Sequence, residues 1–240
     1  MADERLIVAL DVHTMDDVKK LVDELGDAVS YYKVGMELYY SVGEAVLDYL
    51  SEKGKKIFLD LKLHDIPNTV AGGLCSLLFH HVTMMNVHAS GGYTMMKMAA
   101  ERLREAAKKA NVEPPKLIAV TILTSMSDDD WKEMGETEPI KERVVRLARL
   151  AKKAGLDGVV ASPNEASLIR EACGKDFLIV TPGIRPAGSS TDDQSRIATP
   201  HAALESGATS IVVGRPIRAA ANPREAAKRI IEEMGGAAVK

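Results

Sequence analysis

Eight short apolar runs alternate with longer amphipathic stretches along this chain, and this alternation restricts its fold more than any other feature. The runs are of strand length and lie at residues 6–10, 31–34, 57–61, 84–87, 117–122, 158–161, 178–180 and 210–213. Between them, apolar residues recur at helical spacing at residues 15–25, 42–53, 94–109, 140–154, 165–173 and 223–234. Repeated strand–helix units of this kind predict a parallel sheet that is covered by helices.

A chain of 240 residues is long enough for one large core, and eight such units suffice to close a barrel. We therefore expect an α/β protein in which residues 1–240 form a single (β/α)8 TIM-barrel domain. An open, doubly wound sheet is the alternative. The segment Asp11-Val12-His13-Thr14 after the first run lacks a glycine-rich dinucleotide fingerprint, which counts against a Rossmann fold.

Charge and cysteine usage restrict the partners and the compartment. The formal net charge is −3 with acidic and basic residues interspersed, so we expect neither nucleic acid nor a membrane as a partner. Cys75 and Cys173 lack metal or redox spacing and are interpreted as buried free thiols, which predicts a cytoplasmic protein. The run at 6–10 is too short for a signal peptide, and no later run could span a bilayer.

The third apolar run ends in charges of alternating sign, in the order Asp60-Leu61-Lys62-Leu63-His64-Asp65. Apolar residues occupy every second position from 57 to 63, so Asp60 and Lys62 share the opposite face of the strand. Because unpaired buried charges are costly, this pattern indicates either a structural ion pair or a site that needs both charges. Asp65 could equally be the N-cap of a helix that starts near Pro67.

Polar residues also follow the other apolar runs. In a parallel barrel the carboxyl ends of the strands meet at one mouth, which is where active sites form. The residues that this rule brings together are Asp11, Lys33, Asp60, Lys62, His88, Thr121, Thr124 and Arg215. Each of them alone could be a cap or a salt bridge, so their convergence is what indicates a site.

The segment 181–194 and the pair Gly214-Arg215 follow the last two runs, where barrels most often bind phosphate. A phosphorylated substrate is therefore expected. The segment contains glycine, serine and charged residues, which also suits a lid that closes over a ligand. The alternative is a mobile surface loop with a solvated arginine.

Residues 58–69 resemble the signature of the orotidine 5′-monophosphate decarboxylase family. Further segments resemble other landmarks of that family, in order, at residues 9–11, 32–35, 87–89, 121–125, 181–185, 193–194 and 213–216. The approach to the fourth run at 79–83 departs from the family pattern. The resemblance implies a homodimeric barrel that converts orotidine 5′-monophosphate to uridine 5′-monophosphate and carbon dioxide without a cofactor or a metal.

The resemblance also implies roles for individual residues. Lys33, Asp60, Lys62 and Asp65 would form a catalytic charge array, with Asp65, Ile66 and Thr69 entering from the neighbouring subunit. Asp11 and Lys33 would bind the ribose hydroxyls, and Thr124 the pyrimidine edge. The remaining substrate-binding residues, mainly at the phosphate, would be Pro182, Arg185, Gln194, Gly214 and Arg215.

Loss of carbon dioxide from C6 of the pyrimidine leaves a poorly delocalised carbanion, and Lys62 could both stabilise and protonate it. Flanking carboxylates favour the ammonium form of Lys62, which counts against a Schiff-base aldolase. A magnesium-dependent sugar-phosphate decarboxylase or aldolase of the same superfamily is the closest alternative. A barrel that binds a nucleotide without catalysis is the third.

Overall fold

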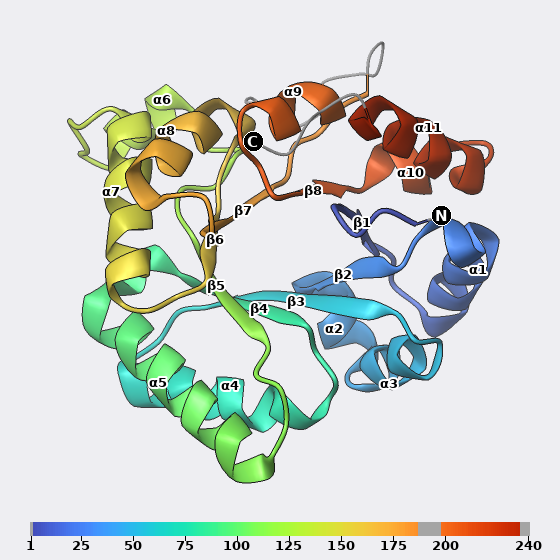
Figure 1. Cartoon of the computed structure of the whole chain (residues 1–240), viewed down its shortest axis with the longest axis horizontal. Helices are drawn as coiled ribbons and strands as arrows, with labels where there is room; N and C mark the ends of the chain where they lie inside the picture. The colour runs from blue at the N-terminus through green and yellow to red at the C-terminus, as the bar shows by residue number, and fades with distance from the viewer. Residues whose placement is uncertain (1, 187–197, 236–240) are drawn as a thin grey trace.

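The computed structural model describes residues 2–186 and 198–235, and the strands form one closed parallel barrel (Figure 1). In chain order the strands are β1 (Leu6–Ala9), β2 (Tyr31–Gly35), β3 (Lys56–Leu63), β4 (Met84–His88), β5 (Lys116–Val120), β6 (Gly158–Val160), β7 (Leu178–Thr181) and β8 (Ser210–Val213). Each strand pairs with the next, and β8 returns to β1, where Ile211 lies opposite Leu6. Closure confirms the predicted (β/α)8 barrel and excludes an open sheet, which would leave two unpaired edges.

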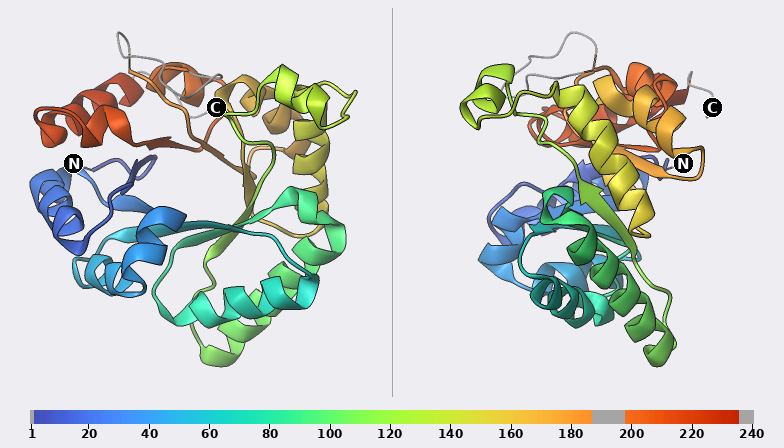
Figure 2. Two further views of the ribbon diagram at one scale, coloured as in Figure 1. Left: turned by 180° about the vertical axis from the view of Figure 1, so that it is seen from behind. Right: turned by 90° about the vertical axis from the view of Figure 1, so that its left-hand side faces the viewer.

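Helices surround the strands, as the views from behind and from the side show (Figure 2). They are α1 (Met15–Leu25), α2 (Met36–Val42), α3 (Ala45–Glu52), α4 (Pro67–Ser76), α5 (Gly92–Ala110), α6 (Asp128–Glu133), α7 (Ile140–Lys153), α8 (Pro163–Cys173), α9 (Pro200–Glu205), α10 (Arg215–Arg218) and α11 (Pro223–Gly235). Helices α1 and α11, which come from opposite ends of the chain, pack against each other and so complete the outer layer at the β8–β1 closure.

The helix predicted at 42–53 corresponds to α3, which begins three residues later and ends one residue earlier. Helix α2 ends at Val42, and Gly43 has a φ of 65°, a left-handed conformation that glycine adopts without strain. Helix α3 then begins at Ala45. The short helices α2, α9 and α10 have no counterpart among the predicted elements, because one or two turns are too few to show a helical period.

The strands separate two apolar layers. Side chains of one set fill the barrel interior, among them Ile7, Phe58, Met84, Ile118, Val180 and Val212. The alternate set, which includes Val8, Val34 and Leu59, packs outward against the helices. On β3 the predicted alternation is confirmed, since Asp60 and Lys62 continue the inward face that begins with Phe58.

Two further predictions concern thiols and surface charge. Both cysteines are free and Cys173 is buried, but Cys75 is only half-buried, so its predicted burial is wrong.

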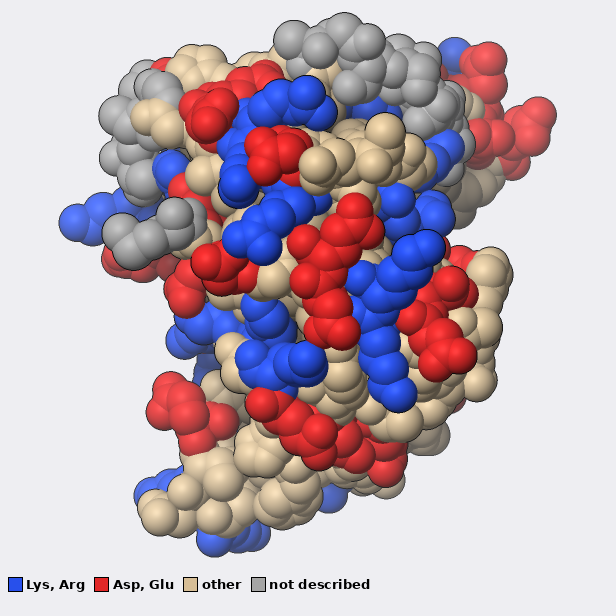
Figure 3. Space-filling view, turned by 90° about the vertical axis from the view of Figure 1, so that its right-hand side faces the viewer, with Lys and Arg blue, Asp and Glu red and all other residues tan. Residues whose placement is uncertain are grey.

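Basic and acidic side chains intermix on the face shown in Figure 3, as their spacing in the sequence predicts. Within the described part of the chain, no helix has the length and the apolar composition that crossing a bilayer requires.

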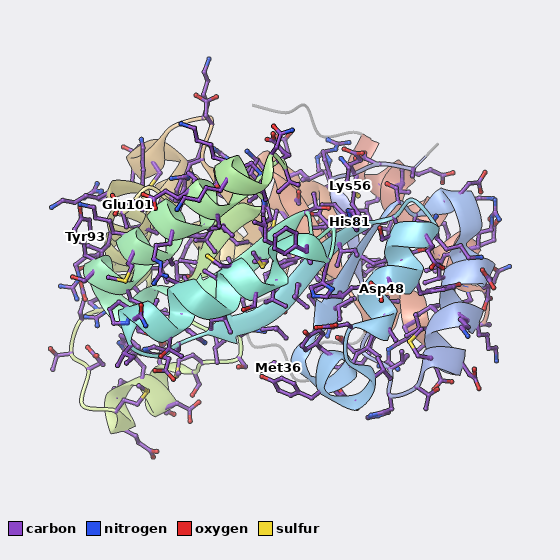
Figure 4. The ribbon with its side chains drawn as sticks, turned by 90° about the horizontal axis from the view of Figure 1, so that it is seen from below. Met36, Asp48, Lys56, His81, Tyr93 and Glu101 are labelled. Carbon is purple, nitrogen blue, oxygen red and sulfur yellow. The ribbon has the colours of Figure 1, made fainter. Side chains whose placement is uncertain are left out.

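The two ends of the barrel can be told apart in Figure 4. Lys56 and His81, which begin β3 and precede β4, lie at the amino-terminal end of the strands, whereas Met36, which follows β2, lies at the opposite end. Helices α4 and α5 lie side by side along the outside between these ends. The mouth on the side of Met36 is where the predicted site residues should meet.

Candidate active site

The end of β3 departs from regular strand pairing at the residues that carry charge. Leu59 pairs with Met85 and Leu63 with Val87, so β3 takes four steps where β4 takes two. Lys62 has a φ of 54°, which is uncommon for a residue with a side chain. Such bulges re-aim side chains next to active sites, and here Asp60 and Lys62 come to lie at the mouth of the barrel.

Four charged side chains form a continuous series of ion pairs at this mouth. Lys62 Nζ lies 2.8 Å from Asp60 Oδ1, and Lys33 Nζ lies 3.5 Å from Asp60 Oδ2. Lys33 Nζ also lies 3.0 Å from Asp11 Oδ1, so the series runs from β1 through β2 to β3. The sequence thus correctly predicts that these four residues converge, although their positions lie as far as 51 residues apart.

The protonation states of the array follow from its alternating charges. Burial alone raises the pKa of Asp60, but the ammonium groups of Lys33 and Lys62, with hydrogen bonds from Lys62 and Asn86, outweigh burial and hold that pKa below 3.8. Burial likewise lowers the pKa of Lys33, but Asp60 and Asp11 raise it above 10.5. At neutral pH, Asp60 is therefore a carboxylate and Lys33 an ammonium.

The low pKa of Asp60 predicts a specific acid sensitivity. A carboxyl group whose pKa is lower in the folded protein stabilises the fold above its unfolded pKa of about 3.9, and this stabilisation is lost as the pH falls through the folded pKa. We expect the difference in unfolding free energy between the wild type and Asp60→Asn to be constant near neutral pH and to shrink below about pH 4. Urea unfolding across this pH range measures it, and parallel curves would contradict the assigned charge.

A cavity of about 220 Å³ opens beside the array. Its charged wall consists of Lys33, Asp60 and Lys62. Its apolar lining comes from four different strands, through Phe58, Val120, Val160 and Val212, and from Ile122 and Leu123 after β5. Thr124, which is buried, and Pro182 also line it, and both are among the residues predicted to bind substrate. Such a cavity suits a small ligand that is partly apolar and carries a charged group.

The predicted phosphate ligands lie on the segments after β7 and β8. Arg185 is buried, and its backbone N–H bonds to the carbonyl of Ala198. Gly214 precedes α10, and a Cβ at this glycine would lie 3.3 Å from Asp11 Oδ2, so a side chain there would crowd the array. Arg215 begins α10 and is exposed. Gln194 lies outside the described residues.

The three residues predicted to cross into a neighbouring subunit lie on or beside the start of α4. Asp65, Ile66 and Thr69 are all exposed, and Ile66 is 67% exposed. The helix N-cap is Ile66 rather than Asp65, so the alternative interpretation of Asp65 as the cap is wrong. Asp65 Oδ1 instead accepts a hydrogen bond from the N–H of Ile66 at 2.6 Å.

Thr121 and His88, two polar residues at strand ends, contact neighbouring residues of the barrel. Thr121 is buried, and its hydroxyl donates to the carbonyl of Val160 at 2.9 Å, which ties β5 to β6. His88 stands with its ring centre 5.6 Å from that of His64. Burial, His64 and Lys62 together lower the pKa of His88, so its ring is neutral at neutral pH. Among the described residues, no group of three or more His, Cys, Asp or Glu side chains is placed to hold a metal ion.

Comparison with known proteins places this chain in a family. The model of the orotidine 5′-phosphate decarboxylase / HUMPS family matches residues 4–230. This chain belongs to that family. The orotidine 5′-phosphate decarboxylase of Geotalea daltonii is 52% identical over 230 residues, which cover 96% of this chain and 95% of the relative. That of Moorella thermoacetica is 49% identical, over 97% of this chain and 93% of the relative.

A solved structure of the family agrees in fold. The crystal structure of orotidine 5′-phosphate decarboxylase from Lactobacillus acidophilus matches with a TM-score of 0.85 at 46% identity, and the match covers 97% of this chain and 99% of that chain. Family membership confirms the resemblance that the signature at 58–69 indicates, and the shared fold confirms its barrel.

Asn86 is a polar residue of the site that the sequence patterns did not single out. Asn86 lies on β4, is 1% exposed, and bonds to both Asp60 and Lys62. A signal for it exists, because Asn86 is the single amide in an otherwise mostly apolar run and shares a strand face with His88. The apolar lining of the cavity was also missed, since its residues look like ordinary core positions in the sequence.

Proposed function

We propose that residues 1–240, as a single cytoplasmic barrel domain, decarboxylate orotidine 5′-monophosphate to uridine 5′-monophosphate and carbon dioxide, a step of pyrimidine nucleotide synthesis. The observation that carries this proposal is the Lys62 ammonium, held 2.8 Å from the Asp60 carboxylate on the wall of an apolar cavity. Family membership and relatives named orotidine 5′-phosphate decarboxylase support it.

Lys62 would do the central chemistry. When the bond from C6 to the carboxylate breaks, its electron pair remains on C6, and a cation beside C6 stabilises that charge more in the transition state than in the ground state. The same ammonium then gives its proton to C6, which yields uridine 5′-monophosphate. The apolar side chains that line the same cavity would lower the local dielectric constant and so strengthen this electrostatic effect.

Asp60 and Lys33 would prepare Lys62 for this task. Asp60 pairs with the Lys62 ammonium and orients it, and Lys33 neutralises the second oxygen of Asp60 from the other side. A substrate carboxylate placed next to Asp60 is repelled by it, and this repulsion is relieved as carbon dioxide leaves. The array therefore destabilises the bound substrate carboxylate relative to the transition state in which carbon dioxide leaves C6.

The remaining substrate contacts are proposed from the family resemblance and from their places at the mouth. Asp11 and Lys33 would bind the ribose hydroxyls, and Thr124 the pyrimidine edge. The predicted ligands near the phosphate are Pro182, Arg185, Gln194, Gly214 and Arg215. Binding energy from a phosphate remote from C6 can offset the strain at the reacting carbon.

We also propose that the active form is a homodimer in which Asp65, Ile66 and Thr69 enter the neighbouring site. Ile66 supports this, because it presents most of an apolar side chain to solvent beside the mouth. Asp65 would add a second carboxylate to the Lys33–Asp60–Lys62 array of the other chain. One complete site then requires two chains.

The contacts that Asp60 already makes distinguish this function from its closest alternative, the magnesium-dependent enzyme. Both oxygens of Asp60 already face ammonium groups, and Oδ1 also accepts from Asn86 at 2.7 Å. A magnesium ion of a sugar-phosphate decarboxylase or aldolase would have to displace at least one of these cations. We therefore propose a reaction that needs neither metal nor other cofactor.

The test is to add orotidine 5′-monophosphate to the purified protein, with and without a chelator, and to follow the absorbance of the pyrimidine. We expect equal conversion in both samples. Activity that is lost with the chelator and restored by magnesium would favour the metal-dependent alternative. Tight binding of uridine 5′-monophosphate without any turnover would instead favour a nucleotide-binding barrel.

Replacing Arg215 by alanine is expected to weaken binding of uridine 5′-monophosphate by about 10- to 100-fold, because charge-assisted hydrogen bonds to phosphate are strong. Binding of uridine, which lacks the phosphate, should hardly change. Titration calorimetry measures both affinities. The matched control is Arg224→Ala, which removes an arginine that pairs with Asp27 beside α1. Equal affinities in wild type and Arg215→Ala would move the phosphate site elsewhere.

A further inference from the structure

Asn86 connects the two charged residues of β3 from the neighbouring strand. Its Oδ1 accepts the backbone N–H of Lys62 at 2.8 Å, and its Nδ2 donates to Asp60 Oδ1 at 2.7 Å. We propose that Asn86 is a positioning residue for the proposed decarboxylation, which holds the backbone of Lys62 and the carboxylate of Asp60 in a fixed relation. This inference rests on the proposed function and adds to it a residue that acts through Lys62 and Asp60 rather than on the substrate.

The chemistry of the two partners fixes the orientation of the amide. The N–H of Lys62 can only donate, and the Asp60 carboxylate can only accept. If the amide of Asn86 were turned over, its NH₂ would face a donor and its oxygen would face a carboxylate. A side chain that has one donor and one acceptor side by side is therefore what this position requires. Among the standard residues, asparagine offers this pair on the shortest side chain.

The backbone at Lys62 needs an anchor because regular strand pairing is interrupted there. The register between β3 and β4 shifts between Leu59 and Leu63, and Lys62 lies in the left-handed region within this interval. Residues with a Cβ occupy that region only when surrounding structure imposes it. The hydrogen bond from the Lys62 N–H to a buried side-chain oxygen supplies such a constraint.

The same amide completes a closed set of contacts around Asp60. Oδ1 of Asp60 accepts from both Lys62 Nζ and Asn86 Nδ2, while Lys62 itself is bonded to Asn86 through its backbone. The ammonium and the amide group thus converge on one oxygen. Because Asn86 is neutral, it orients Asp60 without changing the charge of the array, and its hydrogen bond contributes to the low pKa of that carboxyl.

The first experiment compares Asn86→Ala with the wild type in steady-state turnover of orotidine 5′-monophosphate. We expect kcat to fall on the order of 100-fold, because small displacements of a catalytic group have effects of this size, and KM to change by less than about threefold. The control is Thr83→Val, since the Thr83 hydroxyl accepts from the N–H of Ile57 and joins the same two strands at their other end. This control should keep the wild-type kcat.

The second variant, Asn86→Asp, separates the two hydrogen bonds. It keeps an oxygen for the Lys62 N–H but places a second carboxylate against Asp60. Like charges in contact raise the pKa of one of the pair, so we expect the acid limb of the kcat profile to move to higher pH. An unchanged profile with a wild-type kcat would overturn the role assigned to the contact with Asp60, even if Asn86→Ala failed to fold.

A readout without substrate tests the anchor itself. In protein labelled with ¹⁵N-lysine, we expect hydrogen exchange of the Lys62 amide to be slow in the wild type and in Asn86→Asp, and at least about tenfold faster in Asn86→Ala. This result would stand even if the wild type failed to convert orotidine 5′-monophosphate, which would defeat only the proposed function. A kcat in Asn86→Ala within about threefold of wild type, or an equal loss in Thr83→Val, would overturn the inference.

Discussion

Lys62→Ala is expected to lower the turnover of orotidine 5′-monophosphate by at least about 10⁴-fold, because the substitution removes both the proton donor and the cation beside C6. The fold should remain, because alanine and lysine both carry a Cβ and so place a similar demand on the left-handed backbone at residue 62. Asp60 also still pairs with Lys33. Steady-state kinetics measures the loss, while circular dichroism and binding of uridine 5′-monophosphate check that the protein is intact.

The matched control is Lys56→Ala. Lys56 lies on the same face of the same strand and also forms an ion pair, with Glu4 at 2.7 Å, but it lies at the other end of the barrel (Figure 4). This variant should retain full activity. Near-normal turnover by Lys62→Ala would remove Lys62 from the centre of the mechanism.

Mixing inactive Lys62→Ala and Asp65→Ala subunits should restore activity, if Asp65 completes the site of the neighbouring chain. In each mixed dimer one site carries both substitutions and the other carries neither. After random exchange of equal amounts, about a quarter of the sites should be intact. The expected turnover per site is therefore about a quarter of the wild-type value, against almost none in either parent protein.

Subunit exchange has to be verified independently, for example by mass spectrometry of dimers that differ in isotope labelling. A mixture of Lys62→Ala with Asp60→Ala is the matched control, because both residues lie on one strand and should serve the same site. That mixture should stay inactive. No recovery in the Asp65 mixture after complete exchange would show that Asp65 does not act across the dimer.

The contacts within the array help to explain why the removal of Lys62 should have a large effect. Asp60 is buried and carries hydrogen bonds or ion pairs to Lys33, Lys62 and Asn86 at once. In such a coupled group the removal of one member changes the charge and the orientation of the others. We therefore expect double substitutions within the array to cost less than the sum of the single ones, which kinetic double-mutant cycles can measure.

Local pattern was sufficient to locate the eight strands, whereas their closure into a barrel was decided by the tertiary structure. Each strand alternates between an interior face and a helix-covered face, and both faces are apolar, so short apolar runs mark all eight strands in the sequence. The same alternation is sufficient to place Asp60 and Lys62 on one face of β3. Periodicity was insufficient for α2, α9 and α10, because such short segments contain too few turns.

Residue type alone did not distinguish a site residue from a structural one. Thr121 and Thr124 both follow β5, yet Thr124 lines the cavity whereas the Thr121 hydroxyl bonds to the carbonyl of Val160 on β6. The difference is set by which way each side chain points after the strand ends. That direction depends on the neighbouring strand, and the sequence does not record it.

The sequence by itself therefore determined the positions of the strands along the chain, the inward face of β3 and the charges that could meet at the mouth. Only the tertiary structure decided the contacts among them, because their partners lie far away in the chain: Lys33 bonds to Asp11 across 22 residues, and Asn86 to Asp60 across 26. Barrel closure brings these positions together. At the shift of register between Leu59 and Leu63, a side chain of β4 then replaces regular strand pairing and binds the N–H of Lys62.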